Sequence, residues 1–165
     1  MLLLTGEYEG TLDEKGRVFI SNKLRNQIDC DEHGSNFYLT IGPNGVLSLY
    51  PEKYFRQFAL AESPGTAAPD EAVVFERMSF ALASKVELDR QGRLLINEKI
   101  RKRANLRNNL TLVGIRDHIE LWNSQDWDKY VSDNFRQFQQ QTIPGERDHY
   151  LPSSFFTSCT KSVAS

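Results

Sequence analysis

Two arginines in this 165-residue chain occupy the same local sequence context. Arg17 and Arg93 each follow an aspartate by four positions and a glycine by one. A guanidinium group is a planar, permanently charged fork that can bond a phosphate, or the edge of a guanine, through two hydrogen bonds. The spacing therefore predicts two equivalent anion-binding side chains on two equivalent turns.

Each arginine belongs to a longer internal repeat. Residues 12–25 and 88–101 both read Leu-Asp-x-x-Gly-Arg-φ-φ-Ile-x-x-Lys-φ-Arg, where φ is apolar and the two copies are 76 positions apart. A repeat at fixed offset indicates that one structural unit occurs twice. At roughly 75 residues, each half is near the size at which a separate core is marginal, so we expect the halves to share one core.

The aspartate and glycine of each copy are predicted to shape a turn. A type I turn followed by a left-handed residue favours Asp at its first position and Gly at its fourth. The Asp side chain accepts hydrogen bonds from the turn amides, and Gly adopts a positive φ without steric cost. The turn-shaping residues are Asp13, Gly16, Asp89 and Gly92. The alternative is that each aspartate forms a salt bridge with the arginine of its own copy.

The charge of the chain is segregated. The formal net charge is −2, but residues 10–25 hold four basic and two acidic side chains, for a net +2. Residues 85–107 hold eight basic and three acidic side chains, for a net +5, and the remainder therefore sums to −9. Local charge attracts a polyanion more directly than the total does, although two solvated helix faces would give the same counts.

If the polyanion is DNA, Arg17 and Arg93 would make the central contacts. Other cations of the repeat would contact phosphates, which supply affinity and salt dependence but no sequence information. These further candidates are Lys15, Lys23, Arg25, Arg90, Lys99 and Arg101.

The pattern of apolar residues and turns predicts the same order of elements in both halves. In the first half we expect strands at 7–12, 17–20, 37–41 and 46–50, with helices at 23–28 and after Pro51. In the second half we expect strands at 85–88, 93–96, 110–113 and 118–122, with helices at 97–104 and 124–139. The first half carries about four extra residues in the loop 29–36, and a helix at 71–83 joins the halves.

These residues resemble the MraZ family, bacterial regulators built from two tandem domains of the SpoVT-AbrB type. The resemblance covers roughly residues 4–139. It rests on the doubled Asp-x-x-x-Arg signature and on three further segments, Gly6–Tyr8, Leu112–Gly114 and His118–Trp122. The chain departs from the family pattern at Ser21 and Asn97, where proline usually follows the second strand of each half.

The resemblance implies a mainly β fold with short helices (α+β), in which two SpoVT-AbrB-like units form a swapped-hairpin β-barrel and an intramolecular pseudo-dimer. The domains would span residues 5–60 and 84–139, with a linker and connecting helix at 61–83 and a flexible tail at 140–165. The resemblance also implies a closed ring of subunits that binds double-stranded DNA repeats upstream of the operon holding its own gene and cell-division and wall-synthesis genes. Such a regulator would be cytoplasmic and associated with the nucleoid.

Other classes of function have weaker support in the sequence. Cys30 and His33 form a Cys-x-x-His pair, but zinc takes four ligands, and the other cysteine, Cys159, is distant. We expect free thiols, no metal, no cofactor, no catalysis and no small-molecule substrate. No apolar run approaches the ~20 residues that span a membrane, and residues 1–4 are too short for a signal peptide, so no membrane partner is expected. The alternative function is a protein-interaction or assembly module on the same fold that does not bind DNA, favoured by the net acidity and by Phe155 and Phe156 in the tail.

Overall fold

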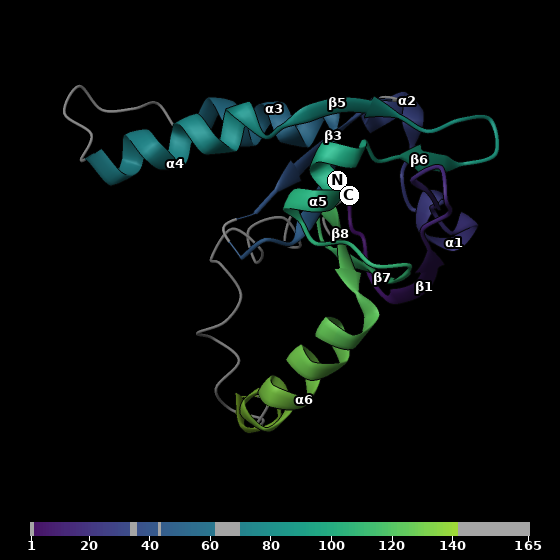
Figure 1. Cartoon of the computed structure of the whole chain (residues 1–165), viewed down its shortest axis with the longest axis vertical. Coiled ribbons are helices and arrows are strands. Elements are labelled where there is room, and N and C mark those ends of the chain that lie inside the picture. Colours follow the sequence, from purple (N-terminus) through teal and green to yellow (C-terminus); the bar gives the residue numbers. More distant parts are fainter. Residues whose placement is uncertain (1, 34–35, 43, 62–69, 142–165) are drawn as a thin grey trace, which may run out of the picture. The chain divides into compact units, whose positions relative to one another are not determined.

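The architecture comes from a computed structural model that describes residues 2–33, 36–42, 44–61 and 70–141. The chain divides into two units, residues 1–127 and 128–165, and each is considered by itself (Figure 1). The predicted linker at 62–69, the tail from 142 onward and Cys159 lie outside the described residues.

The elements of the two halves follow one another in the same order. The first half contains β1 (Glu7–Thr11), β2 (Arg17–Phe19), α1 (Asn22–Arg25), α2 (Cys30–His33), β3 (Asn36–Ile41), β4 (Leu47–Pro51) and α3 (Glu52–Ala61). After α4 (Asp70–Ala81), the second half contains β5 (Ser84–Glu87), β6 (Arg93–Leu95), α5 (Glu98–Arg103), β7 (Asn109–Ile115), β8 (His118–Asn123) and α6 (Ser124–Gln141). The short helix α2 occupies the extra residues of the first half and has no counterpart among the described residues of the second.

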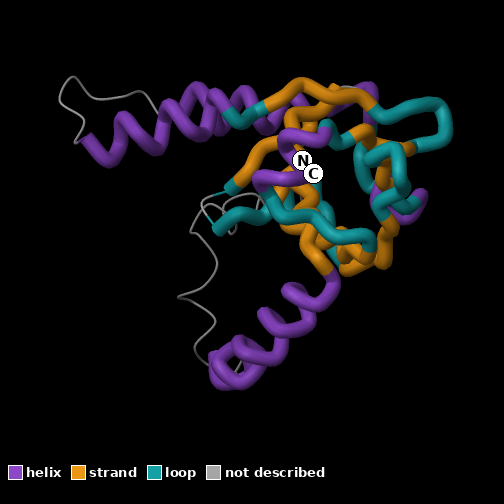
Figure 2. Tube along the Cα trace, in the orientation of Figure 1, coloured by secondary structure: helices purple, strands orange, loops and turns teal. Residues whose placement is uncertain are grey.

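The strands form two sheets whose order is symmetric under exchange of the halves. The larger sheet has the order β1-β7-β8-β4-β3-β5, and β2 pairs with β6 in a separate two-stranded ribbon. Exchanging each strand for its repeat equivalent reverses the order of the larger sheet without changing it. Figure 2 shows the strands of both halves gathered together.

Equivalent residues pair with each other at two places. Ser48 lies opposite Glu120 across β4 and β8, and Val18 lies opposite Leu94 across β2 and β6. An approximate twofold axis therefore passes through the centre of each sheet.

The predicted hairpins are exchanged between the halves. Only an isolated bridge, Leu12 to Val18, links the two strands of the first predicted hairpin, and Leu88 to Leu94 does so in the second, within the residues that the structure describes. Instead, β1 pairs along its length with β7, and β5 pairs with β3. This exchange confirms the predicted fold class, a mainly β, duplicated arrangement with short helices.

A single hydrophobic core serves both halves. Val18 and Leu94 contribute side chains that are fully buried, and so do Ile20 and Ile96, the equivalent residues at the ends of the ribbon. Because these residues come from both copies of the repeat and pack in one cluster, neither half could bury them alone. The prediction of a shared core is confirmed.

The helices show where local sequence decides their ends. Asn97 caps α5, since its side chain accepts a hydrogen bond from the Ile100 amide at 2.9 Å. Ser21 occupies the corresponding position before α1 but makes no side-chain capping bond to the described residues. The joining helix begins at Asp70 and ends at Ala81, slightly earlier than predicted. None of the helices in the described ranges combines the length and apolar character that crossing a membrane requires.

Candidate nucleic-acid interface

The first Asp-x-x-x-Arg turn is organised around the carboxylate of Asp13. Its Oδ1 accepts hydrogen bonds from the Lys15 amide at 3.0 Å and from the Arg17 amide at 2.8 Å. Its Oδ2 accepts a third bond from Nε of Arg17 at 2.8 Å. The chain folds this way locally because one short acceptor satisfies two turn amides while Gly16 supplies the left-handed conformation, with φ at 78°.

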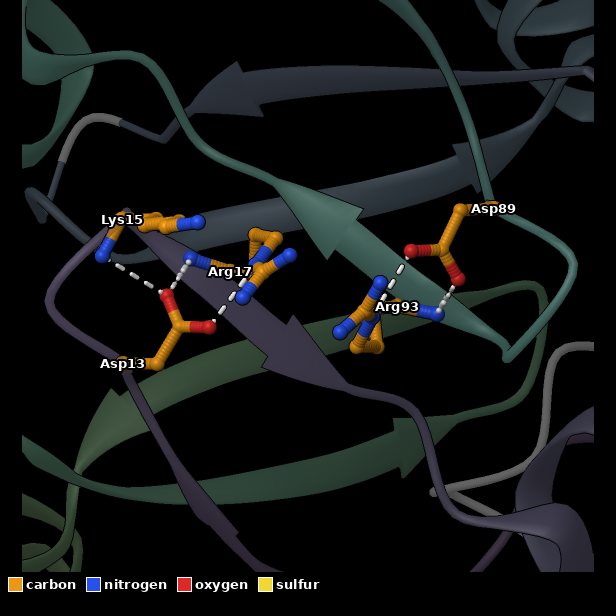
Figure 3. A network of polar contacts seen from close by, with 5 residues as sticks. All are labelled: Asp13, Lys15, Arg17, Asp89 and Arg93. Carbon is orange, nitrogen blue, oxygen red and sulfur yellow. Dashed lines mark hydrogen bonds and ion pairs between the residues drawn. The ribbon is translucent and has the colours of Figure 1, made fainter.

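The second turn repeats this geometry around Asp89 (Figure 3). Oδ1 accepts from the Gln91 amide at 2.9 Å and the Arg93 amide at 3.0 Å, and Oδ2 accepts from Nε of Arg93 at 2.7 Å. Gly92 has φ at 77°. The two turns thus place two arginines in equivalent positions, and all four residues predicted to shape the turns lie where that role requires.

Hydrogen bonding lowers the pKa of both turn aspartates. The backbone amide of Arg17 is the largest cause for Asp13, and its guanidinium and the Lys15 amide act in the same direction. The backbone amide of Arg93 is likewise the largest cause of the lowered pKa of Asp89. Both carboxylates are therefore ionised at neutral pH, and each partly balances the charge of its arginine.

The ion pairs leave most of each guanidinium unused. The Arg17 and Arg93 side chains are 30% and 31% exposed, so neither is sealed inside the protein. In the part of the chain that the structure describes, each pair uses Nε, and no η nitrogen of either arginine has a hydrogen-bond partner. The salt bridge considered as an alternative does form, but it orients the arginine rather than occupying its outer edge.

Both arginines lie on one face of the two-stranded ribbon. Arg17 is opposite Leu95 and Arg93 is opposite Phe19, while the pair between them, Val18 and Leu94, is buried. Because side chains alternate across a strand, the four flanking residues share the outward face. We call Arg17, Phe19, Arg93 and Leu95 the ribbon face. The two arginines come from adjacent strands, on either side of the approximate twofold axis (Figure 3).

Two of the candidate cations brace the opposite turn. The guanidinium of Arg25 lies against Gly92, where it would collide with an added Cβ, and Arg101 lies in the same way against Gly16. Nε of Arg25 donates to the Ile20 carbonyl at 3.0 Å, and its NH2 group donates to the Asn22 side chain. Nε of Arg101 is buried without a hydrogen-bond partner among the described residues. Each helix of one half thus supports the arginine-bearing turn of the other half, which sequence reasoning did not predict.

The remaining candidate cations are exposed around these turns. Lys15 and Arg90 are exposed at the turns themselves, and Lys23 and Lys99 are exposed on α1 and α5. Their positions suit contacts to a backbone of phosphates, since flexible exposed cations provide charge without fixed geometry.

His118, in the segment that carries part of the resemblance, is satisfied inside the sheet. Its Nδ1 lies 2.8 Å from Oδ1 of Asp117, and its ring stacks on Tyr50 with the centroids 4.5 Å apart. Burial acts to lower the pKa of His118, but Asp117 and Glu120 outweigh it and the pKa is raised. The described residues contain no group of three or more His, Cys, Asp or Glu side chains placed to hold a metal ion.

The fold and the ribbon face define a class of protein: a duplicated, mainly β chain whose two halves exchange strands and display paired arginine turns. Comparison with known proteins gives the family. The model of the MraZ protein family, described as antitoxin-like, matches residues 3–75 and 79–144, so the chain belongs to the MraZ family.

Curated relatives match the chain over nearly their whole length. A protein of Pediococcus pentosaceus named "Transcriptional regulator MraZ" is 35% identical over 138 residues, which cover 82% of this chain and 92% of the relative. Proteins of the same name from Finegoldia magna and Limosilactobacillus reuteri are 33% and 32% identical, over 80% and 84% of this chain and 89% and 94% of the relatives.

Proposed function

We propose that this protein is a sequence-specific DNA-binding transcriptional regulator. The observation that carries the proposal is the ribbon face, where Arg17 and Arg93 lie on adjacent strands and their η nitrogens bond to none of the described residues. A pair of arginines related by a twofold axis suits the two strands of a duplex, which are related in the same way. The names of the curated relatives support regulation of transcription.

Phosphate contacts would come from the exposed cations around the ribbon face. Lys15, Lys23, Arg90 and Lys99 carry their charge on the turns and helices that flank it. Arg25 and Arg101 would act chiefly by holding the opposite turns in place, because their guanidinium groups pack against Gly92 and Gly16. The proposal assigns no catalytic residue, no cofactor and no small-molecule substrate.

A closed ring of subunits would raise the affinity of this small surface. Exposed apolar side chains suitable for contacts between copies lie on three helices: Leu60 on α3, Val74 and Met78 on α4, and Val131 and Phe135 on α6. Several identical ribbon faces on one assembly would bind repeated DNA elements together, so each additional contact forms at high effective concentration. The DNA would be repeats upstream of the operon that holds the chain's own gene with cell-division and wall-synthesis genes, and the protein would be cytoplasmic and nucleoid-associated.

The test is a gel-shift titration of the chain's own upstream region across a salt series. The double variant Arg17→Ala, Arg93→Ala should bind at least about tenfold more weakly at moderate salt, because charged contacts are each worth on the order of 1–3 kcal/mol. Arg56→Ala is the matched control, since Arg56 also pairs with a carboxylate four residues earlier, Glu52, but lies outside the repeat. Binding of the double variant with the affinity of the wild type would refute the proposed site.

A second function, a protein-interaction module that does not bind DNA, is favoured by one observation. Each ribbon arginine already pairs with an aspartate, and the net charge of the chain is −2. This function predicts no DNA binding even at low salt, whereas the DNA-binding function predicts binding that weakens steeply as salt rises.

A further inference from the structure

The ribbon face carries two exposed apolar side chains that the arginine contacts do not explain. Phe19 is 47% exposed and Leu95 is 59% exposed, although their strand neighbours Val18 and Leu94 are fully buried. We propose that Phe19 and Leu95 contact thymine methyl groups in the major groove and so help to determine which DNA sequence is bound. This inference rests on the proposed DNA-binding function and adds to it two residues that read bases.

The register of the ribbon places each apolar side chain beside a cation. Leu95 lies opposite Arg17, and Phe19 lies opposite Arg93. Directly opposed side chains on an antiparallel pair have Cβ atoms about 5 Å apart, so a ligand that reaches an arginine also meets its apolar partner. The surface therefore offers two copies of a cation beside an apolar group, related by the approximate twofold axis.

The major groove of DNA presents the matching chemistry. It admits a two-stranded β-ribbon, and its edges display acceptors on guanine for arginine and a methyl group on thymine for an apolar side chain. The minor groove and the phosphates offer no methyl group, so they would leave Phe19 and Leu95 solvated or badly matched. The mixed character of the ribbon face thus favours base edges over the backbone alone.

Phe19 is held in place before any ligand arrives. The Arg25 guanidinium lies over its ring, 5.4 Å from the centroid, and is itself fixed by a hydrogen bond to the Ile20 carbonyl. An aromatic ring restrained in this way loses little conformational freedom on binding. Leu95 has no ring for a cation to cover, so the two halves of the ribbon face differ in size and rigidity. We therefore expect Phe19 to contribute more than Leu95, and the two halves of a bound site to be read unequally.

The experiment measures the affinity of the full chain for one duplex made in two forms. The probe is the upstream region of the chain's own gene, amplified with thymidine or with deoxyuridine, which differ only by the methyl group in the major groove. The proteins are the wild type, the double variant Phe19→Ala, Leu95→Ala, and the control Leu3→Ala, which truncates an apolar side chain of similar exposure, 56%, outside the ribbon.

The wild type should prefer the thymine duplex by about fourfold for each methyl group contacted. Phe19→Ala, Leu95→Ala should lose that preference and bind the thymine duplex as the wild type binds the uracil duplex. Its salt dependence and unfolding midpoint should stay those of the wild type, because no charge and no buried atom is removed. Leu3→Ala should keep the preference.

The outcomes separate this inference from the proposed function. If the double apolar variant keeps the preference of the wild type for thymine, the contact to the methyl groups is refuted, whether or not its affinity falls. If it loses the preference while Arg17→Ala, Arg93→Ala binds normally, the methyl contact holds and the arginine site is wrong. If the wild type binds neither duplex, both the function and the inference fail.

Discussion

The two arginine turns match each other closely, whereas the segments around them do not. Corresponding hydrogen bonds to Asp13 and Asp89 differ by at most 0.2 Å, and Gly16 and Gly92 have φ values within 1°. By contrast, among the described residues α5 has a capping side chain that α1 lacks, and only the first half contains α2. The requirement shared by the halves is therefore the placement of the arginine, and the supporting structure around it is free to differ.

The largest expected effect tests whether the two halves share one core. Leu94→Ala should lower the free energy of unfolding by about 2–5 kcal/mol, because it leaves a cavity among fully buried neighbours. Val18→Ala, directly opposite, removes two carbons rather than three and should cost about two thirds as much. Urea denaturation should show one transition for both variants. Two separate transitions would contradict a common core.

The glycines of the turns give a sharper comparison between the halves. Alanine at either position would sit at a positive φ, which costs roughly 1–2 kcal/mol. At Gly16 the added Cβ would also lie 2.8 Å from the Ile96 carbonyl oxygen, whereas at Gly92 it would meet the end of the Arg25 side chain, which can move. Gly16→Ala should therefore destabilise the protein by about 3 kcal/mol and Gly92→Ala by about 1–2 kcal/mol. Equal losses on urea denaturation would mean that the Ile96 carbonyl yields as readily as the arginine.

The helix caps provide a matched pair of smaller effect. Asn97→Ala should cost about 1 kcal/mol, because it removes the bond to the Ile100 amide. Ser21→Ala should change the free energy of unfolding by less than about 0.5 kcal/mol, since the Ser21 side chain caps none of the described amides. A larger loss for Ser21→Ala than for Asn97→Ala in thermal denaturation would reverse the assignment of the two caps.

The turn carboxylates predict the smallest effect, a dependence of stability on pH. Their folded pKa values are lowered, so each stabilises the fold above the unfolded pKa near 3.8 and loses that contribution as pH falls through the folded pKa. Asp13→Asn with Asp89→Asn should flatten this acid loss, because the amide oxygen still accepts from the turn but does not titrate. The check is the urea midpoint from pH 3 to pH 7. An equally steep acid loss in the double variant would assign the effect to other carboxylates.

The sequence predicts the local features of this protein better than the contacts between its halves. Asp13 and Gly16 declare their turn because the chemistry of a turn is contained within four residues. The pairing of β1 with β7 follows from the resemblance to the family, but not from the residues themselves. An alternating strand fits a partner in its own half as well as one in the other half.

The least predictable part of the site is the contact of Arg25 with Gly92, and of Arg101 with Gly16. The sequence marks all four residues as parts of the repeat, but it indicates charge for the arginines and a turn for the glycines. Their proximity arises only when β2 and β6 pair across the approximate twofold axis. Phe19 and Leu95 are equally hard to single out, although the alternation of Arg17, Val18 and Phe19 would have placed Phe19 on the outward face.

The central claim is that Arg17 and Arg93 are equivalent members of one DNA-binding surface. The most direct measurement is the slope of log affinity against log salt concentration for Arg17→Ala and Arg93→Ala, each tested singly on the upstream duplex. We predict that the two variants weaken binding to a similar extent and that each lowers the slope by about one for every phosphate that the variant no longer binds. A normal slope and affinity in either variant would contradict the account, because an arginine without a role at one turn cannot be half of a paired interface.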